Sequence, residues 1–134
     1  MNDAVGSSAS KRILVIDDSE IDRMVMEEIL TQAGYQVVLA ADGDEGLETF
    51  YGSSFDLVIT DMVMPGKMGI DVILELKKKH PDLKVIAMSA GGDFGPEIEL
   101  GMAKDLEAHT ITKPFEPEQI LKAISDQFAD TAEE

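Results

Sequence analysis

Three aspartates stand at the ends of predicted strands, where a carboxylate is well placed to do chemistry. Asp61 follows the strand predicted at 57–60, and Asp17 and Asp18 follow the apolar run at 13–16. Continuous apolar runs of this kind indicate strands buried on both faces, as in a parallel sheet covered by helices. Ligands of such sheets bind at the carboxyl ends of the strands. We therefore expect the three carboxylates at one edge, where a hard divalent cation such as Mg²⁺ would relieve their repulsion.

Two further strand ends carry groups that suit phosphoryl transfer. Ser89 follows the strand predicted at 84–88, and Lys113-Pro114 follows the one at 110–112. Lys113 would place a fixed positive charge beside the carboxylates. A carboxylate flanked by a metal ion and an ammonium group can attack a phosphoryl group, because both cations neutralise charge that spreads over the transferring oxygens. The product would be an acyl phosphate.

Strand and helix patterns alternate five times, which decides the fold class. Asp42 with Glu45 three residues later marks a helix start, and Gly34 marks a helix end. Alternation with short links gives a parallel sheet with right-handed crossovers and helices on both faces. We therefore predict an α/β fold, a flavodoxin-like doubly wound (βα)5 sandwich whose five-stranded parallel sheet has the order 2-1-3-4-5. The predicted strands are 12–16, 36–40, 57–60, 84–88 and 110–112, and the predicted helices are 19 or 20 to 33, one capped by Asp42, 70–79, 96 to about 106, and 117–128.

Composition limits the class of protein. The chain has 134 residues, enough for one domain, which we place at 11–129 between a disordered tail at 1–10 and an acidic tail at 130–134. It has no cysteine and two histidines, which excludes disulfides, thiolate catalysis and a closed zinc site. The net charge of −16 opposes direct binding to nucleic acid or anionic lipid. With no secretion signal and no run of about 18 apolar residues, we expect a cytoplasmic protein that does not cross a membrane.

The fragments VIDDS, DLVITDMVMPG and TKPF, taken with the order of the chemical residues, resemble the response-regulator receiver family of two-component signalling. The resemblance covers roughly residues 11–129. It implies that Asp61 is the phosphoacceptor, that Asp18 binds Mg²⁺ directly, and that Asp17 binds it largely through water, with Mn²⁺ as an alternative ion. The backbone carbonyl of Val63 resembles the third protein ligand.

The remaining site residues follow from the same resemblance. Ser89 matches the hydroxyl that moves to the phosphoryl oxygen, and Lys113 matches the lysine that pairs with it. The Lys113-Pro114 bond would be cis, an isomer that proline makes accessible at about 0.5–1 kcal/mol. Pro114 and Thr110 belong to the region expected to switch.

The family implies a switch rather than an enzyme that turns over substrates. The domain would accept its phosphoryl group from a histidine kinase or histidine phosphotransfer protein and lose it by hydrolysis. Only about six residues follow the last predicted helix, so we expect a stand-alone domain whose output is contact with another protein. The expected contact surface is formed by the fourth helix, fifth strand and fifth helix.

One position departs from the family pattern. Most receivers carry an aromatic residue three positions before the lysine, and here that position is Thr110. A threonine has no ring to bury, so the usual coupling between the serine hydroxyl and an aromatic rotation is in question. We hypothesise that the glycine-rich link at 90–96 orders on phosphorylation, with Phe94 taking over part of the aromatic role.

Two other classes of function are alternatives to a receiver domain. A Mg²⁺-dependent phosphohydrolase would also use Asp61 as nucleophile, but such enzymes usually carry a second acid two residues later, where this chain has Val63. A flavodoxin-like nucleotide or flavin module would need a Walker loop or a GxGxxG fingerprint, and neither is present.

Overall fold

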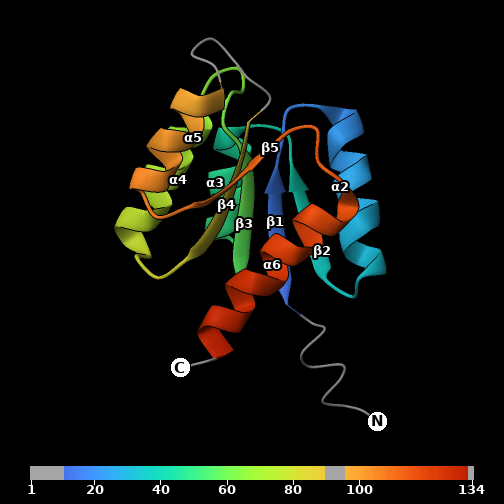
Figure 1. Cartoon of the computed structure of the whole chain (residues 1–134). Coiled ribbons are helices and arrows are strands. Elements are labelled where there is room, and N and C mark those ends of the chain that lie inside the picture. The colour runs from blue at the N-terminus through green and yellow to red at the C-terminus, as the bar shows by residue number, and fades with distance from the viewer. Residues whose placement is uncertain (1–10, 90–95, 133–134) are drawn as a thin grey trace.

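The computed structural model describes residues 11–89 and 96–132, and in them five strands alternate with five helices (Figure 1). All strands pair in parallel, in the order β2-β1-β3-β4-β5. The predicted flavodoxin-like doubly wound fold and its strand order are confirmed. The strands are β1 (Arg12–Ile16), β2 (Gln36–Ala40), β3 (Leu57–Asp61), β4 (Lys84–Ser89) and β5 (His109–Thr112), and the helices are α2 (Glu20–Gln32), α3 (Gly43–Tyr51), α4 (Gly69–Lys79), α5 (Pro96–Asp105) and α6 (Pro117–Ala132).

Local signals set the ends of the first two helices. Asp42 caps α3 by accepting the Glu45 N–H at 2.8 Å, and the Glu45 carboxylate accepts the N–H of Ala41 at 2.8 Å. Gly34 follows α2 with a φ of 99°, a left-handed conformation that favours glycine. These are the signals from which the helix start at Asp42 and the stop at Gly34 were predicted, and both predictions are confirmed.

Two apolar layers enclose the sheet, and alternate residues of each strand point into them. Ile13 and Val15 lie under α2 and α6, whereas Leu14 and Ile16 lie under α3 and α4. A third cluster joins β4 to α4 and α5 on this second face. Figure 1 shows α2 and α6 covering one side of the sheet. The three central strands are therefore buried on both faces, and this packing holds their carboxyl ends in place at one edge of the sheet.

Several elements are longer than the sequence patterns predict. Asp61 belongs to β3 and pairs with Met88, and Ser89 belongs to β4 and pairs with Thr112. The parallel ladder thus extends one residue further than the apolar runs do, because backbone pairing does not depend on an apolar side chain. As a result, Asp61 and Ser89 are the last residues of their strands and not the first residues of the loops that follow.

Helix α6 also exceeds its predicted end at 128 and continues to Ala132. No glycine or proline interrupts it, and each added residue gains one backbone hydrogen bond. The first three residues of the predicted acidic tail at 130–134 thus lie in this helix, and the last two lie outside the described residues, as does the tail predicted at 1–10. Within the described part of the chain, no helix is long and apolar enough to span a membrane.

Candidate functional site

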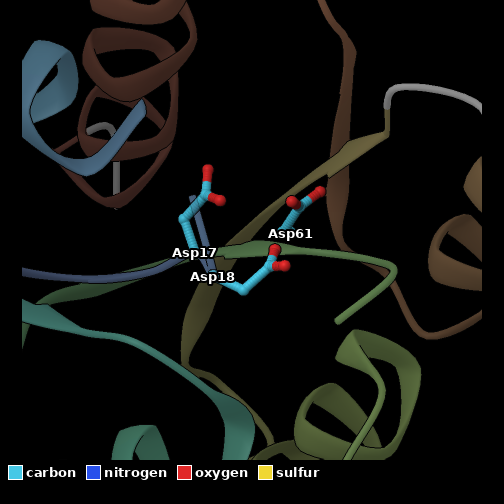
Figure 2. Close-up of side chains that lie close together, drawn as sticks. All are labelled: Asp17, Asp18 and Asp61. Carbon is cyan, nitrogen blue, oxygen red and sulfur yellow. The ribbon is translucent and has the colours of Figure 1, made fainter. Parts of the chain in front are cut away.

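Three carboxylates meet at the carboxyl ends of β1 and β3, as the strand-end argument predicts (Figure 2). Asp17 and Asp18 follow β1, and Asp61 is the last residue of β3. One oxygen of each lies within 4.8 Å of the others. Asp17 and Asp61 are buried, with 1% and 8% of their surfaces exposed, whereas Asp18 is exposed. Within the cluster, Asp18 is therefore the carboxylate most accessible to solvent.

Hydrogen bonds orient the two buried aspartates. Asp17 Oδ1 accepts the N–H of Ser19 at 2.9 Å, and Asp61 Oδ1 accepts the N–H of Met62 at 3.1 Å. The backbone N–H of Asp17 continues the sheet by donating to the carbonyl of Ala40 at 3.1 Å. Both carboxylates are thus held in place by the backbone that follows each strand.

Two oxygen-bearing groups, one in the cluster and one close to it in sequence, accept no hydrogen bond from the described residues. They are the carboxylate of Asp18 and the backbone carbonyl of Val63, two residues after Asp61. Oxygen atoms that have no protein donor can serve a hard cation, which takes carboxylate and carbonyl ligands. The three carboxylates of the cluster supply oxygen ligands of the kind that fits Mg²⁺.

Lys113 reaches this cluster from the loop after β5. Its Nζ lies 2.9 Å from Asp17 Oδ2, 2.9 Å from Asp22 Oδ2 and 3.3 Å from Asp61 Oδ2. The backbone N–H of Lys113 donates to the carbonyl of Ser89 at 2.8 Å, which ties the ends of β5 and β4 together. The Lys113-Pro114 bond is cis, as predicted.

Electrostatics at the site follow from burial and crowding. Burial raises the pKa of Asp61 to about 7, and the neighbouring charges of Asp17 and Asp18 act in the same direction, while Lys113 opposes them. Burial lowers the pKa of Lys113, but the hydrogen bonds to Asp22 and Asp17 and the charge of Asp61 outweigh it, so the net pKa is raised. Lys113 is therefore a permanent cation, and Asp61 is a carboxylate that a further cation would help to ionise.

Ser89 and Thr110 lie on one face of the sheet, on neighbouring strands and offset by two residues in the register. Ser89 is buried at the end of β4, two residues after Ala87, and Ala87 pairs with Thr110. Residues two apart on a strand share a face, and so do paired residues. Thr110 is half-buried and His109 is exposed. The link at 90–95 that contains Phe94 lies outside the described residues.

Three residues of the site did not stand out in the sequence. Asp22 contacts Lys113 from the first turn of α2, and Arg23 Nη1 donates to the carbonyl of Asp17 at 2.6 Å. Gly69, at the start of α4, packs so tightly that a Cβ there would overlap the carbonyl oxygen of Asp61. The Ser19 cap, which places Asp22 in the first helical turn, is the signal that could have pointed to Asp22.

The sequence matches the family model for the response regulator receiver domain over residues 13–125. The chain belongs to this family. It is 38% identical over 118 residues to the chemotaxis protein CheY of Thermotoga maritima, which covers 86% of this chain and 95% of that protein. It is also 41% identical over 113 residues to response regulator RR06 of Streptococcus pneumoniae, covering 84% of this chain but only 50% of that protein.

A solved receiver structure shows the same fold. The response regulator TrrA of Thermotoga maritima, crystallised in complex with Mg(2+)-BeF, superposes with a TM-score of 0.76 at 32% identity. The match covers 87% of this chain and 98% of that one. Receiver domains are signalling switches, and nothing in these relatives supports the phosphohydrolase alternative.

The raised pKa of Asp61 predicts how the stability of the metal-free protein depends on pH. Since this pKa is about 7 in the folded protein and 3.8 when unperturbed, the folded state retains a proton that the unfolded chain releases. Stability therefore falls as the pH rises from about 4 to about 7. At pH 8 in EDTA, Asp61→Asn should raise the free energy of unfolding by about 1–3 kcal/mol, because the lost Lys113 contact offsets part of the relief.

Urea unfolding at pH 8 and at pH 5 checks this expectation. The advantage of Asp61→Asn should shrink at the lower pH, and Mg²⁺ at pH 8 should stabilise the wild type more than the variant. Asp126→Asn, an exposed acid of α6, serves as control and should change stability by less than about 0.5 kcal/mol. A variant no more stable than wild type at pH 8 without metal would contradict the expectation.

The close approach of Gly69 to Asp61 gives a second prediction. Gly69→Ala should lower the free energy of unfolding by about 1–3 kcal/mol, because the added Cβ must displace backbone rather than a flexible side chain. It should also shift the amide resonances of Asp61 and Met62. Gly101→Ala in α5, where a Cβ meets no atom within 4 Å, is the matched control and should stabilise by about 0.5–1 kcal/mol. Equal effects of the two substitutions would rule out this explanation.

Proposed function

We propose that this receiver domain is a phosphorylation-activated switch in which Asp61 accepts the phosphoryl group. The observation that carries the proposal is the convergence on one sheet edge of three carboxylates and an ammonium group 3.3 Å from Asp61. The TrrA complex with Mg(2+)-BeF supports it, since a relative with the same fold takes a metal and a fluoride complex of beryllium. The donor would be a histidine kinase or a histidine phosphotransfer protein.

In the transfer step, one Oδ atom of Asp61 attacks the phosphorus of the donor's phosphohistidine. The new bond joins this oxygen to phosphorus, the phosphorus–nitrogen bond breaks, and the imidazole leaves with the electron pair. Lys113 neutralises charge on the transferring oxygens, and the Ser89 hydroxyl donates to one of them in the product. Water later attacks the phosphorus, which regenerates the carboxylate and releases inorganic phosphate.

The metal ion of the site would be held by Asp17, Asp18, Asp61 and the carbonyl of Val63. Mg²⁺ is the expected ion and Mn²⁺ the alternative, because both accept oxygen ligands. When bound, the ion stabilises the ionised form of Asp61 and the negative charge of the phosphoryl oxygens.

Output would pass to a protein partner at the surface of α5, β5 and α6, the fourth helix, fifth strand and fifth helix of the alternation. This choice of surface is supported by the shared face of Ser89 and Thr110, because Ser89, the proposed contact of the phosphoryl group, lies beside the edge strand β5. Thr110 and Pro114 would be the switching positions. The charge of −16 makes a protein a better partner for the whole domain than nucleic acid.

Acetyl phosphate with Mg²⁺, followed by intact-mass measurement, tests the proposed chemistry. The wild type should gain one phosphoryl group, and Asp61→Asn should gain none, since the amide is not a nucleophile for this transfer. Lys113→Ala should lower the phosphorylated fraction, and EDTA should abolish it. Asp44→Asn, an exposed acid in the first turn of α3, should behave as wild type. Phosphate on Asp61→Asn, or steady turnover of a phosphate ester, would refute the proposal.

A further inference from the structure

Asp22 is a fourth carboxylate at the site, and it comes from a helix rather than from a strand end. Its Oδ2 lies 2.9 Å from Lys113 Nζ, across 91 residues of sequence. The backbone of Asp22 is fixed independently, since its N–H donates to Ser19 Oγ, the N-cap of α2, at 3.2 Å. The backbone of Asp22 therefore keeps a defined position near the lysine whether or not the two side chains are paired.

The ammonium group of Lys113 has no donor to spare. It carries three protons, and its three carboxylate partners in the described residues are Asp17, Asp22 and Asp61. The contact with Asp61 is the longest, at 3.3 Å against 2.9 Å for the other two. A phosphoryl oxygen on Asp61 that is to bind Lys113 must therefore compete with a partner that already holds it.

Asp22 is the partner that can release Lys113 at the lowest cost. Its side chain is 45% exposed, against 1% for Asp17 and 11% for Asp61. It also lies in the first turn of α2, where the helix dipole stabilises a negative charge without a cationic partner. The pair borders a cavity of about 380 Å³ between α2 and the loop that follows β5. Water can therefore solvate both charges when they separate.

We propose that Asp22 is a positioning residue that holds Lys113 before phosphorylation and competes with the phosphoryl group for it. This inference rests on the proposed role of Lys113 as the partner of the phosphoryl oxygen. In the unphosphorylated domain Asp22 keeps the ammonium group displaced toward α2, and after transfer the lysine moves to the phosphoryl oxygen while Asp22 turns to solvent. Asp22 thus opposes the activated state and sets how strongly a phosphoryl group must bind to populate it.

Beryllium fluoride with saturating Mg²⁺ is a suitable probe, because it mimics the acyl phosphate without covalent transfer. Asp22→Ala should tighten its binding by about 2- to 5-fold, the range expected when a partly exposed ion pair no longer competes. Asp22→Asn keeps an oxygen acceptor without the charge, so its effect should be smaller but in the same direction. Binding is followed through amide resonances, and Asp22→Asn carries the test if the alanine variant proves unstable.

Glu20→Ala is the matched control, since it removes one acid from the same helical turn. Glu20 makes no hydrogen bond or ion pair with Lys113 in the described residues. If the effect were only the loss of one negative charge, both alanine variants would tighten binding equally, and the inference would be wrong. It would also be wrong if Asp22→Ala bound the probe no better than wild type.

The Lys113 ammonium resonance gives a readout that a purely structural role would not move. In the metal-free, unphosphorylated protein, the ¹⁵Nζ resonance of Lys113 should shift in Asp22→Ala and stay in place in Glu20→Ala. Failure of the proposed function can be told apart from failure of the role of Asp22, because the proposed function predicts that Asp61→Asn abolishes binding of beryllium fluoride. If beryllium fluoride binds the wild type and Asp22→Ala equally well but does not bind Asp61→Asn, only the role of Asp22 is rejected and the proposed function stands.

Discussion

Three carboxylates contact a single lysine ammonium group at one edge of the sheet and a fourth lies close by, and the behaviour of the site depends on this excess of negative charge. Asp17, Asp22 and Asp61 contact Lys113, while Asp18 completes the cluster without it. When Asp61 is ionised, the Lys113 ammonium group and the nearby Arg23 guanidinium carry fewer charges than the four carboxylates, in a partly buried place where Coulomb interactions are less screened than in water. The residual repulsion favours any species that adds positive charge, and this is the physical basis for a divalent cation here.

The like charges remain together because the fold leaves their backbones no freedom to separate. Asp61 is paired within the ladder to β4, and β1 and β3 lie side by side under apolar layers on both faces. Gly69 closes the space behind Asp61 from the side of α4. Rigid packing of the core thus keeps the like charges together. Burial is the largest cause of the raised pKa of Asp61, and the charges of Asp17 and Asp18 add to it.

The sequence was sufficient for the parts of the site that the sheet itself delivers. Asp17, Asp18 and Asp61 end strands whose parallel pairing forces them to one edge, so their meeting could be deduced from strand pattern alone. The fold and strand order could be predicted for the same reason. The Ser19 cap could have marked Asp22 as an acid of the first turn of α2, but the contacts of Asp22 and Gly69 could not be predicted, because they depend on how α2 and α4 cross the sheet. Side-chain reach across 91 residues, and the gap behind one carbonyl, are set by tertiary packing that has no local sequence pattern.

Thr110 changes what can carry the signal under the proposed function. A ring at this position could report phosphorylation by turning inward, but threonine has too little surface for burial to drive such a movement. Among the described residues, one link that can carry the signal is the hydrogen bond from the Lys113 N–H to the Ser89 carbonyl, which joins the ends of β4 and β5 at 2.8 Å. Both residues proposed to contact the phosphoryl group thus sit on strand ends that are bonded to each other. When Lys113 leaves Asp22 for the phosphoryl oxygen, the loop between β5 and α6 shares the displacement, and that loop leads directly into the proposed partner surface.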